Sequence, residues 1–188
     1  NNITEDFIRL EKIQEGIYNI IMNDNIYKNT FTPEMSYQLG NLLPFLKQNA
    51  RVLILSSSLN HFHVGVNPHF MKRMQKYNSV TMIAGELNYL WKNFIKMMNM
   101  GIPVISVLNG KVYGGGVPIA LWSDYRICTN DLDLHYGNIT RGMSPALQLS
   151  ELLSKYLNNT QILEFYLHNS HLNAQDALGY NIVNKICD

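Results

Sequence analysis

The sequence has few charged residues and almost no excess of either sign. Asp, Glu, Lys and Arg make up 15 % of its 188 residues, well below the roughly 25 % of an average soluble domain. The formal net charge is +1. Proteins that bind nucleic acid or a membrane surface usually carry a basic excess or a basic stripe. We therefore expect neither nucleic acid nor a membrane among the partners of this protein.

Cysteines and long apolar runs are also scarce. The two cysteines, Cys128 and Cys187, do not make a disulfide framework in a chain of this size and indicate reduced thiols in a cytoplasmic protein. No apolar run reaches the roughly 18 residues of a membrane span, and the polar first residues do not resemble a signal peptide. The length suits a single domain, 1–188. Because the chain has no initiator methionine and ends abruptly, we expect this domain to be excised from a larger polypeptide.

Carboxylates are missing from much of the middle of the chain. No Asp or Glu lies between Glu34 and Glu86, and none lies between Glu86 and Asp124. Asparagine, with 23 residues, supplies much of the polar surface instead. General acid–base chemistry with a pair of carboxylates would have to find them outside these two stretches.

Apolar patterns predict strands that alternate with helices. Short strands are expected at 7–12, 16–22, 51–55, 102–108 and 125–128. Helices are expected after the cap Thr32, over 80–99, from the glycines at 114–116 to Trp122, and over most of 146–179. The continuous apolar runs at 51–55 and 102–108 are typical of strands buried on both faces. The expected fold class is therefore α/β, with largely parallel, covered sheets.

Three consecutive glycines, Gly114, Gly115 and Gly116, form the first candidate site. Glycines between a strand and a helix let the backbone approach a ligand, and the start of the helix directs free N–H groups at it. No Gly-Lys-Ser/Thr follows, so the segment is not a P-loop, and the spacing of a dinucleotide-binding fingerprint is absent. Taken alone, the triplet is best explained by a tight turn with close helix packing.

The second candidate is a loop with three histidines, His61, His63 and His69. No carboxylate or cysteine lies nearby and the histidines lack metal-ligand spacing, so we expect no metal site and one histidine facing the site. The segments 62–67 and 113–118 each follow a buried strand and each offer a backbone N–H beside glycine. Two such loops can converge as an oxyanion hole, which stabilises negative charge on a carbonyl oxygen.

Along nearly all of its length the chain resembles the crotonase (enoyl-CoA hydratase/isomerase) superfamily. The most specific match is 102–116, which ends in the glycine triplet and is similar to the family's second oxyanion loop. The segment 62–67, Phe-His-Val-Gly-Val-Asn, resembles the first oxyanion loop, Phe-x-Ala-Gly-x-Asp. Further matches are the strand at 16–23, the turn at 28–31, Ser123-Asp124, Gly142 with Pro145, and a closing strand at 177–184.

The resemblance implies a crotonase-like spiral of ββα turns that binds an acyl thioester and stabilises its enolate. It implies no cofactor beyond the CoA or phosphopantetheine that carries the substrate. Family members usually continue into C-terminal helices that build a homotrimer and roof the pocket. This chain stops before those helices, so we expect them to be truncated or absent.

Carried over by position, the resemblance implies that the donors of the hole are the N–H groups of Val64 and Gly115. The two carboxylates of the family's hydratases fall at Pro118 and Asn138, and neither residue can move a proton. Hydration needs both a base and an acid, and the family's isomerisation needs one carboxylate shuttle. The usual Asp of the first loop is Asn67. These departures argue against a hydratase.

Decarboxylation survives the loss of both carboxylates, because the electrons of the broken C–C bond are held as a thioester enolate without a base. The family includes decarboxylases that act in polyketide β-branching on acyl groups held by a carrier protein, and the turn at 28–32 is similar to that branch. We therefore predict a crotonase-family lyase that decarboxylates an acyl-CoA or acyl-carrier-protein thioester in polyketide biosynthesis. Its partner would be a carrier protein or polyketide synthase.

Side chains around the hole complete this hypothesis. Asn138, Tyr136, His63 or Asn67 would orient the departing carboxylate, and His63 or His69 would reprotonate the product. The residues that we predict to act in catalysis are Val64, Gly115, His63 and Asn138. The predicted substrate-binding residues are Lys28, Gly65, Asn67, His69, Gly114, Gly116, Pro118 and Tyr136.

Two alternatives stay open at this point. A dehydratase or isomerase could use histidine in place of the carboxylates, which requires His63 or His69 to point into the pocket. A binding or scaffold module would have lost catalysis together with its acids, and its mark would be an absent or blocked hole. The intact glycines at 114–116 argue against a scaffold.

Overall fold

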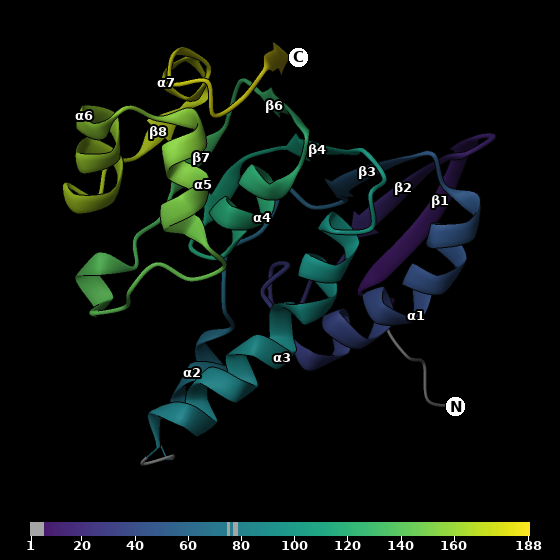
Figure 1. The fold of residues 1–188 in the computed structure, drawn as a ribbon, viewed down its shortest axis with the longest axis horizontal. Coiled ribbons are helices and arrows are strands. Elements are labelled where there is room, and N and C mark those ends of the chain that lie inside the picture. Colours follow the sequence, from purple (N-terminus) through teal and green to yellow (C-terminus); the bar gives the residue numbers. More distant parts are fainter. Residues whose placement is uncertain (1–5, 75, 77–78) are drawn as a thin grey trace.

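Two β-sheets, one large and one small, organise the protein (Figure 1). The computed structural model describes residues 6–74, 76 and 79–188. Within these residues the large sheet has six strands in the order β1-β2-β3-β4-β6-β9, and the small sheet has three in the order β5-β7-β8. The strands are β1 (Ile8–Gln14), β2 (Ile17–Met22), β3 (Val52–Ser57), β4 (Val104–Leu108), β5 (Lys111–Tyr113), β6 (Tyr125–Thr129), β7 (Asp133–His135), β8 (Leu172–Asn173) and β9 (Lys185–Cys187). Apart from the antiparallel pairs β1–β2 and β7–β8, neighbouring strands are parallel.

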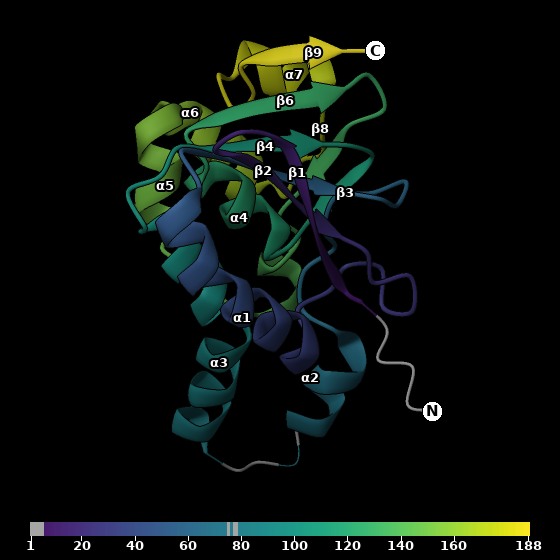
Figure 2. The same cartoon turned by 90° about the vertical axis from the view of Figure 1, so that its right-hand side faces the viewer.

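Helices pack between and beside the sheets. They are α1 (Pro33–Asn49), α2 (Pro68–Met74), α3 (Val80–Met98), α4 (Gly116–Trp122), the 3₁₀ turn η1 (Ile139–Arg141), α5 (Leu149–Tyr156), α6 (Asn159–Ile162), the π-helical η2 (Leu163–Leu167) and α7 (Ala174–Gly179). Figure 2 shows α2 and the first half of α3 extending away from both sheets. None of the helices in the described residues is both long and apolar enough to cross a bilayer.

Helix α1 begins where the sequence predicts and is held against α3 by polar contacts. The Thr32 hydroxyl accepts the Met35 N–H (3.1 Å) and Pro33 occupies the first turn, where its missing N–H costs little. The Asn93 amide of α3 donates to the Ser36 carbonyl (2.6 Å). A Cβ at Gly40 would lie 2.6 Å from that amide nitrogen, so a larger residue would displace the Asn93 side chain from its hydrogen bond.

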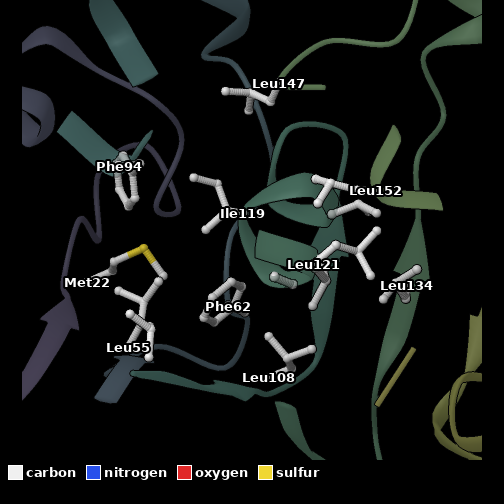
Figure 3. Packing of buried hydrophobic residues seen from close by; sticks show 14 of the residues in the cluster. Met22, Leu55, Phe62, Phe94, Leu108, Ile119, Leu121, Leu134, Leu147 and Leu152 are labelled. Carbon is white, nitrogen blue, oxygen red and sulfur yellow. The ribbon is translucent and has the colours of Figure 1, made fainter. Parts of the chain in front are cut away.

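One apolar core joins the large sheet to α4 and the small sheet. Figure 3 shows Phe62 and Ile119 in the middle of this core. Its buried members include Met22 and Leu55 from the large sheet and Leu134 from the small one. Burying this apolar surface fixes α4 between the sheets, with every residue from Gly116 to Leu121 buried. The start of α4, where the glycine triplet lies, is therefore embedded in the core.

The predicted long elements are present, and the very short ones were missed. The expected strands and the helices at 80–99 and 114–122 correspond to elements of the structure. The sequence patterns did not predict the short helix α2. They also did not predict β5 or β8, because two- and three-residue strands are too short to show a periodicity. The closing strand was wrongly expected at 177–184. It is β9, Lys185–Cys187, since α7 occupies the first part of that range and pairing with β6 begins only at Lys185.

A buried arginine ties the end of the chain to the large sheet. Arg126 of β6 is 1 % exposed, and its guanidinium donates to the carbonyls of Ile182 and Ser123, each at 2.5 Å. It also lies over the Tyr156 ring of α5, 4.4 Å from the ring centroid. Carbonyl dipoles and an aromatic face thus take the place of a carboxylate around this buried cation.

Replacing Arg126 with methionine leaves the two carbonyls without a donor. We expect the Arg126→Met variant to lose about 2–4 kcal/mol of unfolding free energy, measured by urea denaturation. The matched control is Arg9→Met, because Arg9 is exposed on β1; we expect it to change stability by less than about 0.5 kcal/mol. Equal losses in the two variants would contradict the role given to Arg126.

Candidate active site

The two glycine-containing loops meet, as the sequence predicts. A Cβ on Gly65 would lie 3.3 Å from the Gly115 nitrogen, and a Cβ on Gly116 would lie only 2.5 Å from the His63 carbonyl oxygen. Gly65 also has φ +90°, a conformation that side-chain-bearing residues rarely adopt. The first loop and the start of α4 are therefore in backbone contact, which requires glycine on both sides.

Backbone hydrogen bonds hold the first loop on two neighbours. The Tyr113 N–H of β5 donates to the His63 carbonyl (2.9 Å), and the His63 N–H donates to the Lys111 carbonyl (3.3 Å). On the other side, the Phe31 N–H donates to the Gly65 carbonyl (2.8 Å). The loop is thus fixed between β5 and the turn that precedes α1.

Two backbone N–H groups in this contact region have no partner among the described residues. Neither the Val64 N–H nor the Gly115 N–H donates a hydrogen bond to another described residue. Both lie on the touching loops, and Gly115 caps α4, whose first N–H groups point out of the helix. Free, preorganised donors of this kind are what an oxyanion hole requires. Within the described residues, the two N–H groups that an oxyanion hole would use are thus left without a protein acceptor.

Neutral side chains occupy the two positions at which hydratases of the family carry carboxylates. Pro118 is buried in the first turn of α4, where its missing N–H leaves no hydrogen bond unmade. Asn138 lies between β7 and η1 and is half-buried. A Cβ on Gly114 would lie 3.6 Å from Asn138 Oδ1, and the Asn138 amide makes no hydrogen bond with another described residue. This unpaired amide beside the hole is free to bind a substrate.

His63 is buried beneath the hole rather than exposed in a pocket. Its ring is fully buried, 4.3 Å from the Phe31 ring centroid and 6.2 Å from that of Phe94. Its Nδ1 accepts the Gly65 N–H (3.0 Å). Loss of hydration lowers the pKa of His63 to about 3, so the ring is neutral and carries its proton on Nε2. A neutral imidazole is a poor acid, and the predicted reprotonation of product by His63 is therefore wrong.

A cavity beside the Phe31 turn and the start of α2 has two basic residues and one acidic residue, Glu34, in its lining. It measures about 640 Å³, and its lining includes Asn67, His69, Lys72 and Arg73. A second hollow of about 180 Å³ is lined by Lys28 together with His69 and Asn67. The sequence analysis did not single out Lys72 and Arg73. Two basic residues that closely follow the segment 62–67, in a stretch without acidic residues, could have indicated an anion-binding surface.

The remaining predicted residues divide between the cavity and the core. The side-chain Oδ1 of Asn67 accepts the N–H groups of His69 (2.8 Å) and Phe70 (3.3 Å), so it caps α2 and leaves only the side-chain Nδ2 for a substrate. Tyr136 is 1 % exposed, and its hydroxyl accepts the Ala146 N–H (3.0 Å). Outside the predicted set, His135 of β7 stacks on His171, with 3.8 Å between the ring centroids.

The contact between the loops can be tested by adding one methyl group. In Gly116→Ala the new Cβ would meet backbone, so the loops must separate; we expect a loss of at least about 1–3 kcal/mol in unfolding free energy by urea denaturation. Gly85→Ala is the matched control, since a Cβ there has nothing within 4 Å. In the interior of α3 it should stabilise by up to about 1 kcal/mol. Tolerance of Gly116→Ala would contradict the packing described above.

The buried imidazole should make stability depend on pH. The pKa of His63 is about 3 in the folded state against an ordinary value of 6.5, so only the unfolded state binds its proton between these values. Stability from this group is complete above pH 6.5 and falls below it by up to about 1.4 kcal/mol per pH unit. Urea unfolding at pH 7, 6 and 5 should therefore show that the unfolding free energy falls less with decreasing pH in His63→Asn than in the wild type. Parallel pH profiles would show that the ring titrates normally.

Comparison with known proteins agrees with this geometry. The sequence model for the enoyl-CoA hydratase/isomerase family matches residues 12–188. Among solved structures, an enoyl-CoA hydratase from Bacillus halodurans is similar at 20 % identity and TM-score 0.87, over 97 % of this chain and 73 % of that one. An enoyl-CoA hydratase from Shewanella pealeana is similar at 19 % identity and TM-score 0.86, over 97 % of this chain and 68 % of that one. An enoyl-CoA hydratase/isomerase from Cupriavidus metallidurans is similar at 21 % identity and TM-score 0.86, also over 97 % of this chain and 68 % of that one. The predicted resemblance and fold class are confirmed, and the chain belongs to the enoyl-CoA hydratase/isomerase (crotonase) family.

Proposed function

We propose that this protein decarboxylates an acyl thioester by stabilising the enolate that forms when carbon dioxide leaves. The observation that carries the proposal is the combination of a free pair of donors, Val64 and Gly115, with neutral residues at both carboxylate positions. A hole without an adjacent acid–base pair suits a reaction whose only charge development is on the thioester oxygen.

The electron balance of this reaction needs no base. The bond between the carboxylate carbon and the substrate carbon chain breaks, carbon dioxide leaves, and the electron pair moves onto the thioester carbonyl oxygen as an enolate. The Val64 and Gly115 N–H groups bind that oxygen more strongly as it becomes negative, which lowers the barrier. A proton then adds to carbon. His69 is the candidate donor on the chain, because it is exposed and lines a cavity together with Asn67 of the first loop.

Asn138 is suited to hold the departing carboxylate. Its side chain lies beside Gly114, is half-buried and has no hydrogen-bond partner among the described residues. Its amide N–H can donate to a carboxylate without competing for a proton. A negatively charged residue at the same place would repel the substrate and oppose formation of the enolate.

The basic residues that line the cavity support a substrate carried on CoA or phosphopantetheine. Lys72 and Arg73 lie beside Asn67 on the cavity wall, and Lys28 lines the neighbouring hollow. Phosphate groups of either carrier can bind to such cations. We further propose delivery by a carrier protein in polyketide biosynthesis, which rests on the similarity of the turn at 28–32 to that branch of the family. A homotrimer and a cytoplasmic location complete the proposal.

One alternative chemistry has support from a specific observation. Because His69 lines the cavity, it could replace the missing carboxylate as the shuttle of a dehydratase or isomerase. This reaction changes the mass of the acyl group by one water or leaves it unchanged. Decarboxylation instead removes one CO₂, about 44 mass units, so the mass of the product distinguishes the two reactions.

The deciding experiment is mass spectrometry of the protein with a 3-methylglutaconyl-type thioester, presented on CoA and on a carrier protein. We expect loss of carbon dioxide. Loss or gain of water alone would refute decarboxylation and favour the chemistry that uses His69. Absence of turnover on a panel of thioesters would refute catalysis and favour a scaffold. Faster turnover on one carrier identifies the form in which the substrate arrives.

A nearly isosteric change separates binding of the carboxylate from binding of the thioester. In Asn138→Asp the amide donor becomes a repelling charge, so we expect decarboxylation to slow roughly 10- to 100-fold, while the dissociation constant of acetyl-CoA changes little. Asn41→Asp on the exposed side of α1 is the matched control and should keep the wild-type rate. An unchanged rate in Asn138→Asp would remove this residue from the mechanism.

A further inference from the structure

We propose that His63 is a positioning residue of the oxyanion hole, whose ring Nδ1 holds the Gly65 N–H so that only the Val64 N–H of this loop is offered to the substrate. The inference rests on the proposed function, because it assumes that the hole binds a thioester oxygen. It assigns the ring no proton transfer.

The hydrogen bonds of three consecutive residues carry the argument. The His63 N–H is bound by Lys111 and its carbonyl by the Tyr113 N–H. In a trans peptide the C=O and N–H groups point in opposite directions, so the Val64 N–H is directed away from Tyr113. The Gly65 N–H is bound by the His63 ring at 3.0 Å. Of these three successive donors, only that of Val64 is free within the described residues.

The neighbouring peptide needs this restraint because glycine is easily rotated. Gly65 is buried at φ +90°, and its N–H has the His63 ring as its acceptor. Without that acceptor the buried Gly65 N–H would be unpaired, and the loop would have to rearrange to satisfy it, which would displace the Val64 N–H from its place in the hole. The ring itself cannot move away, since it is packed against Phe31 and Phe94 and is fully buried.

The other ring nitrogen indicates that stability is not the reason for a histidine here. His63 Nε2 is buried and makes no hydrogen bond with another described residue. A buried donor without a partner costs free energy, so an apolar side chain would serve the core better. The atom that requires a histidine here is therefore Nδ1, the acceptor of the Gly65 N–H. Burial keeps that nitrogen unprotonated, and with it the acceptor, throughout the physiological range.

The test uses variants that differ in where they place an acceptor. His63→Asn puts an amide oxygen close to the position of Nδ1, His63→Gln puts one close to Nε2, and His63→Leu provides none. The readout is the infrared carbonyl band of bound [1-¹³C]acetyl-CoA, which moves to lower frequency when hydrogen bonds polarise the carbonyl. We expect the wild type and His63→Asn to lower the band, and His63→Gln and His63→Leu to bind the probe with a band closer to its position in solution.

Turnover should follow the same order. We expect kcat for the decarboxylation to fall roughly 10- to 100-fold in His63→Gln and His63→Leu and to recover in His63→Asn, as displacement of a reacting group by about an ångström would cause. Thermal unfolding identifies any variant that does not fold. If His63→Leu does not fold, the comparison of His63→Asn with His63→Gln tests the inference. Equal bands and equal kcat in all folded variants would overturn the inference. No band shift in the wild type would instead refute the oxyanion hole and with it the proposed function.

Discussion

The contact between the loop at 62–67 and the start of α4 is the constraint on which the rest of the site depends. A Cβ would meet backbone atoms of the opposite segment at Gly65 and Gly116, and it would meet the Phe31 ring at Gly115. This contact places the free N–H groups of Val64 and Gly115 on touching segments. The apolar core beneath it, with Phe62 on one loop and Ile119 on the helix, keeps the two segments from separating.

Electrostatics around the hole favour a negative oxygen and disfavour proton transfer. Pro118 and Asn138 are neutral, and burial keeps His63 neutral as well. The lining of the neighbouring cavity includes the cations Lys72 and Arg73 and the anion Glu34. Acid–base groups of hydratases would add charge beside the enolate oxygen. Without such groups the site keeps polar groups that can bind and orient a substrate, which is the basis of the decarboxylation that we propose.

The parts of the fold that could be predicted are those with long or position-specific patterns. The apolar runs at 51–55 and 102–108 predicted buried strands, and Thr32 with Pro33 predicted the start of α1. The glycine pattern predicted the convergence of the two loops. Strands as short as β5 and β8 were missed because they exist only through pairing with distant segments. The buried Arg126 was missed for the same reason, since its partners are carbonyls brought together by folding.

The sequence by itself determined the family, the α/β class, the glycines of the hole and the absence of carboxylates at the two hydratase positions. These properties depend on residue identity and on order along the chain. Only the tertiary structure decided what each polar side chain can do. It buried the His63 ring beneath the hole, left the Asn138 amide unpaired beside Gly114, and placed His69 on the cavity wall. The physical reason is that protonation and hydrogen bonding depend on burial and neighbours, which three histidines in one loop do not reveal until the chain is folded.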